Sequence, residues 1–154
     1  MVIIGIDPGV TGAIALRWEG YYEVYDIPYT VADKKGKRKQ VNPVALWELL
    51  KVQAPNRTRV FLEKTHAMPK NGVIASYSQG DSNGCIRSVC ACLGFPIELV
   101  TPHAWKKYFK LGKDKEVVRA KAIEVFPKAE LHLKKHHNRA EALLIAQYGM
   151  ENET

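Results

Sequence analysis

"IGIDPGVTGAIAL", residues 4–16, places a single charge inside an otherwise apolar and glycine-rich run. Asp7 ends the apolar segment and is followed at once by Pro8 and Gly9, which are typical turn residues. A carboxylate at the end of a buried strand loses hydration unless it gains a partner. The stretch therefore predicts a strand, a turn and a second strand. Asp7 would be partnered either by backbone N–H groups of the turn or by a cation.

The rest of the chain predicts a mixed sheet with helices on its faces. Apolar, β-branched runs indicate strands over residues 2–6, 11–16, 21–27, 59–62 and 97–100. The first three strands are close enough in sequence to form an antiparallel meander. Capping patterns begin helices at Asn42-Pro43, at Thr101-Pro102, at Asp114 and at residue 138 or 139. A further helix of small residues ends at Leu93 and begins near residue 73 or 84, in a glycine-rich segment.

Composition sets the broad class of protein. The chain has 154 residues, of which 46% are apolar and 25% charged, and we expect one globular domain over residues 1–154. No apolar run is long enough to cross a membrane, and the N-terminus lacks a secretory signal pattern, so we expect a cytoplasmic protein. Three cysteines, an odd number, favour reduced thiols over disulfides.

The chain is basic, with 23 Lys and Arg against 16 Asp and Glu, a net charge of +7. Such an excess attracts polyanions and is typical of proteins that bind nucleic acid. Simple solubility or a small anionic substrate would also account for it.

Three acidic residues lie next to apolar segments. Asp7 ends the first strand, Glu63 ends the fourth in "VFLEK", and Glu141 lies in "NRAEALLIA". Converging carboxylates repel one another, and divalent cations such as Mg²⁺ or Mn²⁺ relieve the repulsion. Two such ions could position a phosphodiester and activate water. Taken singly, Glu63 could instead pair with Lys64 or a basic loop, and Glu141 could be an exposed helical residue.

Five segments resemble the RuvC family of Holliday-junction resolvases, in the ribonuclease H-like superfamily. They are "IGIDPGVTGAIAL", "VFLEKTHAMP", "ELVTPHAWKKYFKL", "DKEVVRAKAIEVFP" and "HHNRAEALLIAQYG", in family order over nearly the whole chain. The resemblance is strongest to short phage and bacterial enzymes. It implies an α/β, ribonuclease H-like, mixed five-stranded sheet, with three antiparallel strands followed by two parallel ones and helices on both faces.

The resemblance also implies an activity. It implies a homodimeric endonuclease that uses two Mg²⁺ ions per active site, with Mn²⁺ as a substitute, and that resolves four-way DNA junctions by paired symmetric nicks. Asp7, Glu63 and Glu141 match the family's carboxylates.

The family's remaining ligand is acidic or histidine, one helical turn before the last carboxylate, and here the sequence departs from it. His137 is the favoured candidate, with His136 and Asn138 as alternatives, because positions three and four apart share a helix face. "KKHH" could otherwise be a basic stretch that faces DNA.

Further residues are expected to bind DNA by the same resemblance. Lys106, Lys107 and Lys115 would hold the scissile strand, and Lys37 and Arg38 of "KKGKRK" would grip an outer arm unless this run is only a solvated loop. His66, Met68 and Tyr77 are candidates for a wedge in the junction centre, and Lys64 lies beside them. Trp105 and Tyr108 are expected in the core. The small-residue helix that ends at Leu93 is expected to form the dimer interface.

Other functions compete with this interpretation. "DPGVTG" also resembles the phosphate loop of actin-like and sugar-kinase-like ATP binders, although these proteins need two such domains. A nuclease of flaps, forks or RNA–DNA hybrids would use the same carboxylates. A catalytically weakened junction-binding protein is compatible with the departure near Glu141.

Overall fold

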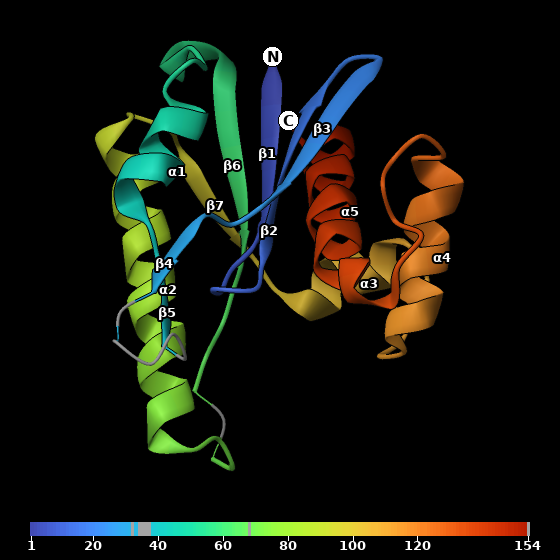
Figure 1. Cartoon of the computed structure of the whole chain (residues 1–154). Helices are drawn as coiled ribbons and strands as arrows, with labels where there is room; N and C mark the ends of the chain where they lie inside the picture. The colour runs from blue at the N-terminus through green and yellow to red at the C-terminus, as the bar shows by residue number, and fades with distance from the viewer. Residues whose placement is uncertain (32, 34–37, 68, 154) are drawn as a thin grey trace.

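The computed structural model describes residues 1–31, 33, 38–67 and 69–153. Its centre is a five-stranded sheet in the order β3-β2-β1-β6-β7 (Figure 1). The strands are β1 (Val2–Asp7), β2 (Ala13–Trp18), β3 (Tyr21–Asp26), β6 (Thr58–Glu63) and β7 (Ile97–Val100). β1 to β3 form an antiparallel meander, while β6 and β7 run parallel to β1. The predicted fold class is therefore confirmed.

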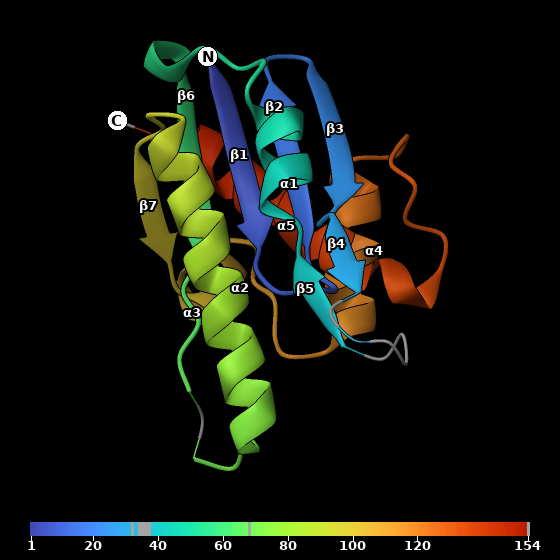
Figure 2. The ribbon, with the colours of Figure 1, turned by 60° about the vertical axis from the view of Figure 1, so that its left-hand side comes forward.

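Helices cover both faces of this sheet. α1 (Pro43–Leu50) and α2 (Val73–Cys92) lie on one face, and α3 (Pro102–Tyr108), α4 (Lys115–Val125) and α5 (His137–Asn152) lie on the other (Figures 1 and 2). Alternation along β1 divides its side chains between two cores. Ile4 and Ile6 join the core under α1 and α2, whereas Ile3 joins the core under α5.

α5 lies unusually close to β1. A Cβ added at Gly5 would lie 2.3 Å from the backbone nitrogen of Ala146 and 2.4 Å from the carbonyl oxygen of Ala142. Only glycine on the strand and small residues on the helix permit this approach. The contact brings the first turns of α5 over the carboxyl end of β1.

The predicted caps begin their helices. Asn42 accepts hydrogen bonds from the backbone N–H groups of Val44 and Ala45, Thr101 accepts one from Ala104, and Asp114 accepts one from Glu116. These bonds satisfy N–H groups that a helix start leaves unpaired. The starts of α1, α3 and α4 were therefore predictable from short capping patterns.

Several elements differ from the prediction. α2 begins at Val73, the earlier of the two expected starts, so Tyr77 lies on a helix rather than in a loop. α5 begins at His137, one residue before the earlier of its two expected starts, and continues to Asn152. A two-stranded sheet of β4 (Tyr29–Val31) and β5 (Lys39–Val41) and two short 3₁₀ helices, η1 (Pro55–Arg57) and η2 (Lys134–His136), were not predicted.

Tyr108 corrects the prediction of a core residue, because its side chain is 44% exposed. It stands at the last position of α3, where its ring packs edge-on against Phe109 and Tyr148 and its hydroxyl donates to Glu151. Trp105, one turn earlier, is fully buried as predicted. Lys37 and Met68 lie outside the described residues. In the part of the chain that the structure describes, no helix is long and apolar enough to cross a membrane.

Candidate active site

Asp7 and Glu63 leave the sheet side by side. Ile6 pairs with Leu62 in the parallel ladder of β1 and β6, so Asp7 and Glu63 are the next residues on adjacent strands. Both side chains take the face of the sheet that α3 and α5 cover, because Ile3 and Phe61, an even number of positions earlier, belong to that core. The strand ends thus bring together two carboxylates that are 56 positions apart in the sequence.

α5 supplies the third carboxylate. Glu141 is only 9% exposed and lies in the second turn of the helix that packs on β1. The Nζ atom of Lys106 on α3 lies 3.3 Å from its Oε1 atom. Lys106 therefore places one positive charge among the three carboxylates.

The three carboxylates act on one another electrostatically. Burial raises the pKa of Asp7 well above its ordinary value, and the charges of Glu141 and Glu63 raise it further, against the opposing effect of Lys115 and Lys106. Burial also raises the pKa of Glu63, an effect that Glu141 reinforces. Asp7 receives no stabilising hydrogen bond within the described residues, so the simple turn interpretation of this carboxylate lacks support there.

Trp105 is a site residue that the sequence did not reveal. Its indole Nε1–H donates to Oε2 of Glu63 at 2.8 Å, which lowers the pKa of this carboxyl and partly offsets burial. The alternative in which Glu63 pairs with Lys64 finds no such ion pair among the described residues. The capping pattern at Thr101 predicted helix α3, but nothing in it indicated that one of its core residues would bond a carboxylate on β6.

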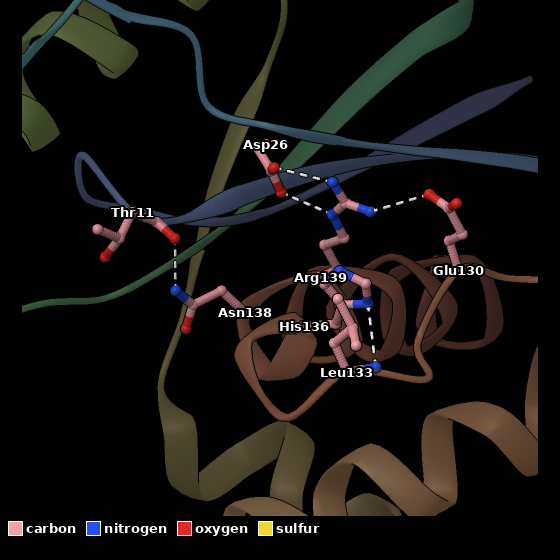
Figure 3. A network of polar contacts seen from close by, with 7 residues as sticks. All are labelled: Thr11, Asp26, Glu130, Leu133, His136, Asn138 and Arg139. Carbon is pink, nitrogen blue, oxygen red and sulfur yellow. Dashed lines mark hydrogen bonds and ion pairs between the residues drawn. The ribbon is translucent and has the colours of Figure 1, made fainter.

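The candidates for the remaining ligand point in different directions. Nε2 of His137 lies 3.2 Å from Nζ of Lys115, and its Nδ1 lies 3.2 Å from the carbonyl oxygen of Lys134. Asn138 donates to the carbonyl oxygen of Thr11 in the turn after Asp7. His136 is buried and packs edge-on against His132. Its Nδ1 accepts a bond from the Leu133 N–H at 3.4 Å (Figure 3).

The donor set fits a hard divalent cation by its chemistry, because carboxylate oxygens are the ligands that Mg²⁺ and Mn²⁺ prefer. Glu63 is held by Trp105 and Glu141 by Lys106. Among the described residues, no group of three or more His, Cys, Asp or Glu side chains is already arranged to hold a metal ion. These contacts use Oε2 of Glu63 and Oε1 of Glu141, so a bound cation would draw on the other oxygen of each carboxylate or displace these partners.

A basic cleft of about 900 Å³ opens beside the carboxylates. Its lining includes five cationic or titratable nitrogen side chains and no carboxylate: Lys64, His66, His103, Lys106 and Lys113. Lys106 connects the cleft to Glu141. Lys107, also expected to bind DNA, is exposed on α3 but does not line this cleft.

A second cleft, of about 880 Å³, lies at the start of α2, and Tyr77 and Arg38 line it. Val73 and Ile74 lie beside Tyr77, with 86% and 84% of their surfaces exposed, against 66% for Tyr77. These two aliphatic residues were not among the sequence-based candidates for contact with bases. The sequence feature that could have identified them is a pair of adjacent apolar residues at the start of an otherwise polar helix.

A mixed sheet of this order, covered by helices on both faces, matches the RuvC, ribonuclease H-like fold. The structure of Thermus thermophilus RuvC in complex with a Holliday junction substrate matches all of this chain and 98% of that chain, with a TM-score of 0.66 and 19% identity. A second Thermus thermophilus RuvC structure matches 98% of this chain and 96% of that chain, with a TM-score of 0.60 and 16% identity.

One curated protein extends the similarity to sequence. The chain is 28% identical to the chloroplastic Holliday junction resolvase MOC1 of Chlamydomonas reinhardtii, over 90% of this chain and 18% of that protein. The chain thus spans less than a fifth of that relative's length. No protein-family model matches the chain. The predicted resemblance to RuvC-like resolvases is confirmed in fold and in sequence similarity.

Proposed function

We propose that this protein is a metal-dependent endonuclease that resolves four-way DNA junctions. The observation that carries the proposal is the meeting of Asp7, Glu63 and Glu141 at the carboxyl ends of β1 and β6, in a basic protein of RuvC fold. The similar proteins are named as a RuvC bound to a Holliday junction substrate and as a Holliday junction resolvase, which supports this choice of substrate.

The carboxylates would hold two Mg²⁺ ions, for which Mn²⁺ could substitute. When bound, such ions polarise a phosphodiester and lower the pKa of water. The chain's own contribution is to bring three anionic side chains to one place, at a cost evident in the raised pKa of Asp7. Release of Glu141 from Lys106 would free this ammonium group to face the scissile phosphate, where its charge would stabilise negative charge as it develops.

His137 is proposed to complete the site, directly as a ligand or by orienting water. Lys115 lies within hydrogen-bond distance of the His137 ring and its charge lowers the pKa of Asp7, so both side chains are near the carboxylates. Asn138 is the alternative, while the buried position of His136 disfavours it.

The DNA path is proposed to follow the two clefts. Phosphates of the scissile strand would contact the basic cleft through Lys64, His66 and Lys106, with Lys107 and Lys115 nearby. Tyr77, with Val73 and Ile74, would meet unpaired bases at the junction centre, and Arg38 would contact phosphates at the rim of the second cleft. Lys37 and Met68 remain sequence-based candidates for the same surface.

Symmetric cutting of a junction requires two active sites. We therefore propose a homodimer, with residues 1–154 acting as a single nuclease domain in each subunit. The small residues exposed along α2 support this interface, because they allow close approach of a second helix. A cytoplasmic, DNA-associated location is proposed with this function.

The proposal is tested by incubating the purified protein with four-way, flap, fork and RNA–DNA hybrid substrates of equal length, with Mg²⁺ or with EDTA. We expect Mg²⁺-dependent paired nicks in the four-way junction and slower cutting of the others. Faster cutting of flaps or hybrids would change the substrate while preserving the chemistry. Tight junction binding with no cutting in Mg²⁺ or Mn²⁺ would favour a junction-binding protein that has lost catalysis.

A further inference from the structure

A polar cluster links the start of α5 to the end of β3 and to the turn that follows Asp7. The guanidinium of Arg139 binds Asp26 at the end of β3 through two bonds, Nε to Oδ1 at 2.6 Å and Nη2 to Oδ2 at 2.8 Å (Figure 3). Its third nitrogen lies 3.3 Å from Oε2 of Glu130 in the segment before η2. The Arg139 side chain is only 19% exposed, so these bonds are partly shielded from water.

A second bond ties the same turn of α5 to the turn that follows Asp7. The side-chain amide of Asn138 donates to the carbonyl oxygen of Thr11, in the turn between β1 and β2 (Figure 3). Asn138 and Arg139, consecutive residues of α5, are therefore bonded to the turn after β1 and to the last residue of β3.

Arg139 and Glu141 are two positions apart on α5, and this spacing relates the bonds of Arg139 to the direction of Glu141. Successive residues in an α-helix are rotated by 100°, so Arg139 points to nearly the opposite side of α5 from Glu141. A pair of bonds on Arg139 therefore resists rotation of the helix about its axis. The contact of α5 with Gly5 fixes the separation of helix and strand, and Leu143, Leu144 and Ile145 bury the following turns of α5 in the core. The bonds of Arg139 act at the first turn, before these buried side chains begin.

We infer that Arg139, held by Asp26, is a positioning residue that fixes the rotation of α5 and so directs Glu141 toward Asp7. Asp26 ends β3 and Asp7 ends β1. These two strands run in the same direction, and both residues pair with Ala13 of β2, so they lie at the same end of the sheet. This inference rests on the proposed function for its activity readout. Arg139 and Asp26 act through α5, because among the described residues neither has a hydrogen bond or ion pair with the three carboxylates of the candidate site.

The test compares two ion pairs on the same helix. Asp26→Asn removes the charge from a side chain that is 66% exposed, with little change in packing. Arg59→Gln breaks a matched pair at the other end of α5, where Arg59 Nε lies 2.6 Å from Glu153 Oε1. We expect Asp26→Asn to lower the single-turnover nicking rate about tenfold. Junction affinity in Ca²⁺ should stay within about twofold, and Arg59→Gln should leave the rate unchanged.

Two further measurements separate positioning from a general loss of stability. Arg139→Gln combined with Asp26→Asn should cost no more than Arg139→Gln alone, because Arg139→Gln already removes the interaction with Asp26, together with the one to Glu130. The reversed pair, Asp26→Arg with Arg139→Asp, should recover most of the lost rate. If the reversed pair does not fold, the nicking rates of Asp26→Asn, Arg139→Gln and their combination still test the inference. Additive losses would overturn the inference.

An activity-independent readout distinguishes this inference from the proposed function. Mn²⁺ affinity, measured from the EPR signal of the free ion, should weaken about tenfold in Asp26→Asn and stay unchanged in Arg59→Gln. If the wild type cuts no branched DNA, the proposed function fails, while the Mn²⁺ comparison still tests the positioning role. If the wild type cuts junctions and Asp26→Asn retains both rate and Mn²⁺ affinity, the positioning role alone is wrong.

Discussion

Asp7 carries its charge in an unfavourable environment. Burial and two neighbouring glutamates raise the pKa of its carboxyl, and among the described residues the charges of Lys115 and Lys106 oppose this increase. Under the proposed function the site attracts cations, and it would keep negative charge where the folded protein alone does not favour it. Function and stability therefore conflict at this residue.

The conflict predicts how the stability of the metal-free protein depends on pH. A carboxyl whose pKa is higher in the folded than in the unfolded chain binds more protons when folded, so the free energy of unfolding falls as pH rises from about 4 to the raised pKa. Glu63 contributes with the same sign. We expect Asp7→Asn to reduce this decline and to raise Tm at pH 7 by a few degrees, measured in EDTA by thermal unfolding.

Glu19→Gln is the control for this comparison. Glu19 is exposed in the turn between β2 and β3, at the other end of β2 from Asp7, and its replacement should leave the pH profile unchanged. An Asp7→Asn variant that is less stable than the wild type at pH 7 would contradict the account of this charge.

His137 gives a second prediction at the scale of single residues. His137→Ala should lower the nicking rate at least tenfold, a loss of about 1.4 kcal/mol of transition-state stabilisation, without weakening junction binding in Ca²⁺. Single-turnover kinetics measure the rate. His132→Ala is the matched control, because His132 is exposed and packs only on His136 among the histidines described. Unchanged kinetics in His137→Ala would make Asn138 the better candidate.

Residues of the site differed in how far the sequence predicted them. Asp7, Glu63 and Glu141 were predictable because a carboxylate next to an apolar run needs a partner. The bond from Trp105 to Glu63 and the pair of Lys106 with Glu141 were not, since they depend on how α3 packs against α5. Arg139 and Asp26 are 113 positions apart, and no local pattern connects them.

Among the elements, the contact of α5 with β1 determines where Glu141 lies. It depends on Gly5, where an added Cβ would approach the Ala146 nitrogen to 2.3 Å. We expect Gly5→Ala to lower the free energy of unfolding by about 3 kcal/mol or more, because backbone atoms of α5 would have to move. Chemical denaturation measures the change.

Gly112→Ala serves as the control for Gly5→Ala. An added Cβ at Gly112 has no atom within 4 Å, so stability should change by less than about 0.5 kcal/mol. Equal effects of the two substitutions would contradict the close contact of α5 with β1.

Helix boundaries show the limit of local patterns at this scale. α1, α3 and α4 begin at side chains that cap them, and their starts were predicted. α2 begins at Val73 with no side-chain cap and continues through Gly80 and Gly84, which disfavour helix. Its packing against α1 and β5 compensates for this low propensity, and only the tertiary structure reveals such packing.

At the scale of the whole molecule, net charge of +7 and a basic cleft predict salt-dependent DNA binding. Each Lys that contacts a phosphate contributes about one unit to the slope of log K against log salt concentration. Lys64→Ala and Lys113→Ala should each reduce this slope by about 1, measured by fluorescence anisotropy in Ca²⁺. Lys51→Ala, which removes a pair with Glu48 on α1, should leave the slope unchanged. If both variants have the same slope as the wild type, the basic cleft does not contact the DNA phosphates.

The central claim is that carboxylates from β1, β6 and α5 act together as one cation-dependent cutting site. The most direct measurement is single-turnover nicking of a four-way junction in Mg²⁺ by Asp7→Asn beside the wild type, with junction affinity of both proteins determined in Ca²⁺. We predict equal affinity and a nicking rate reduced at least about a thousandfold, because Asp7 is the most central of the three carboxylates. Nicking by Asp7→Asn at the wild-type rate would contradict the account.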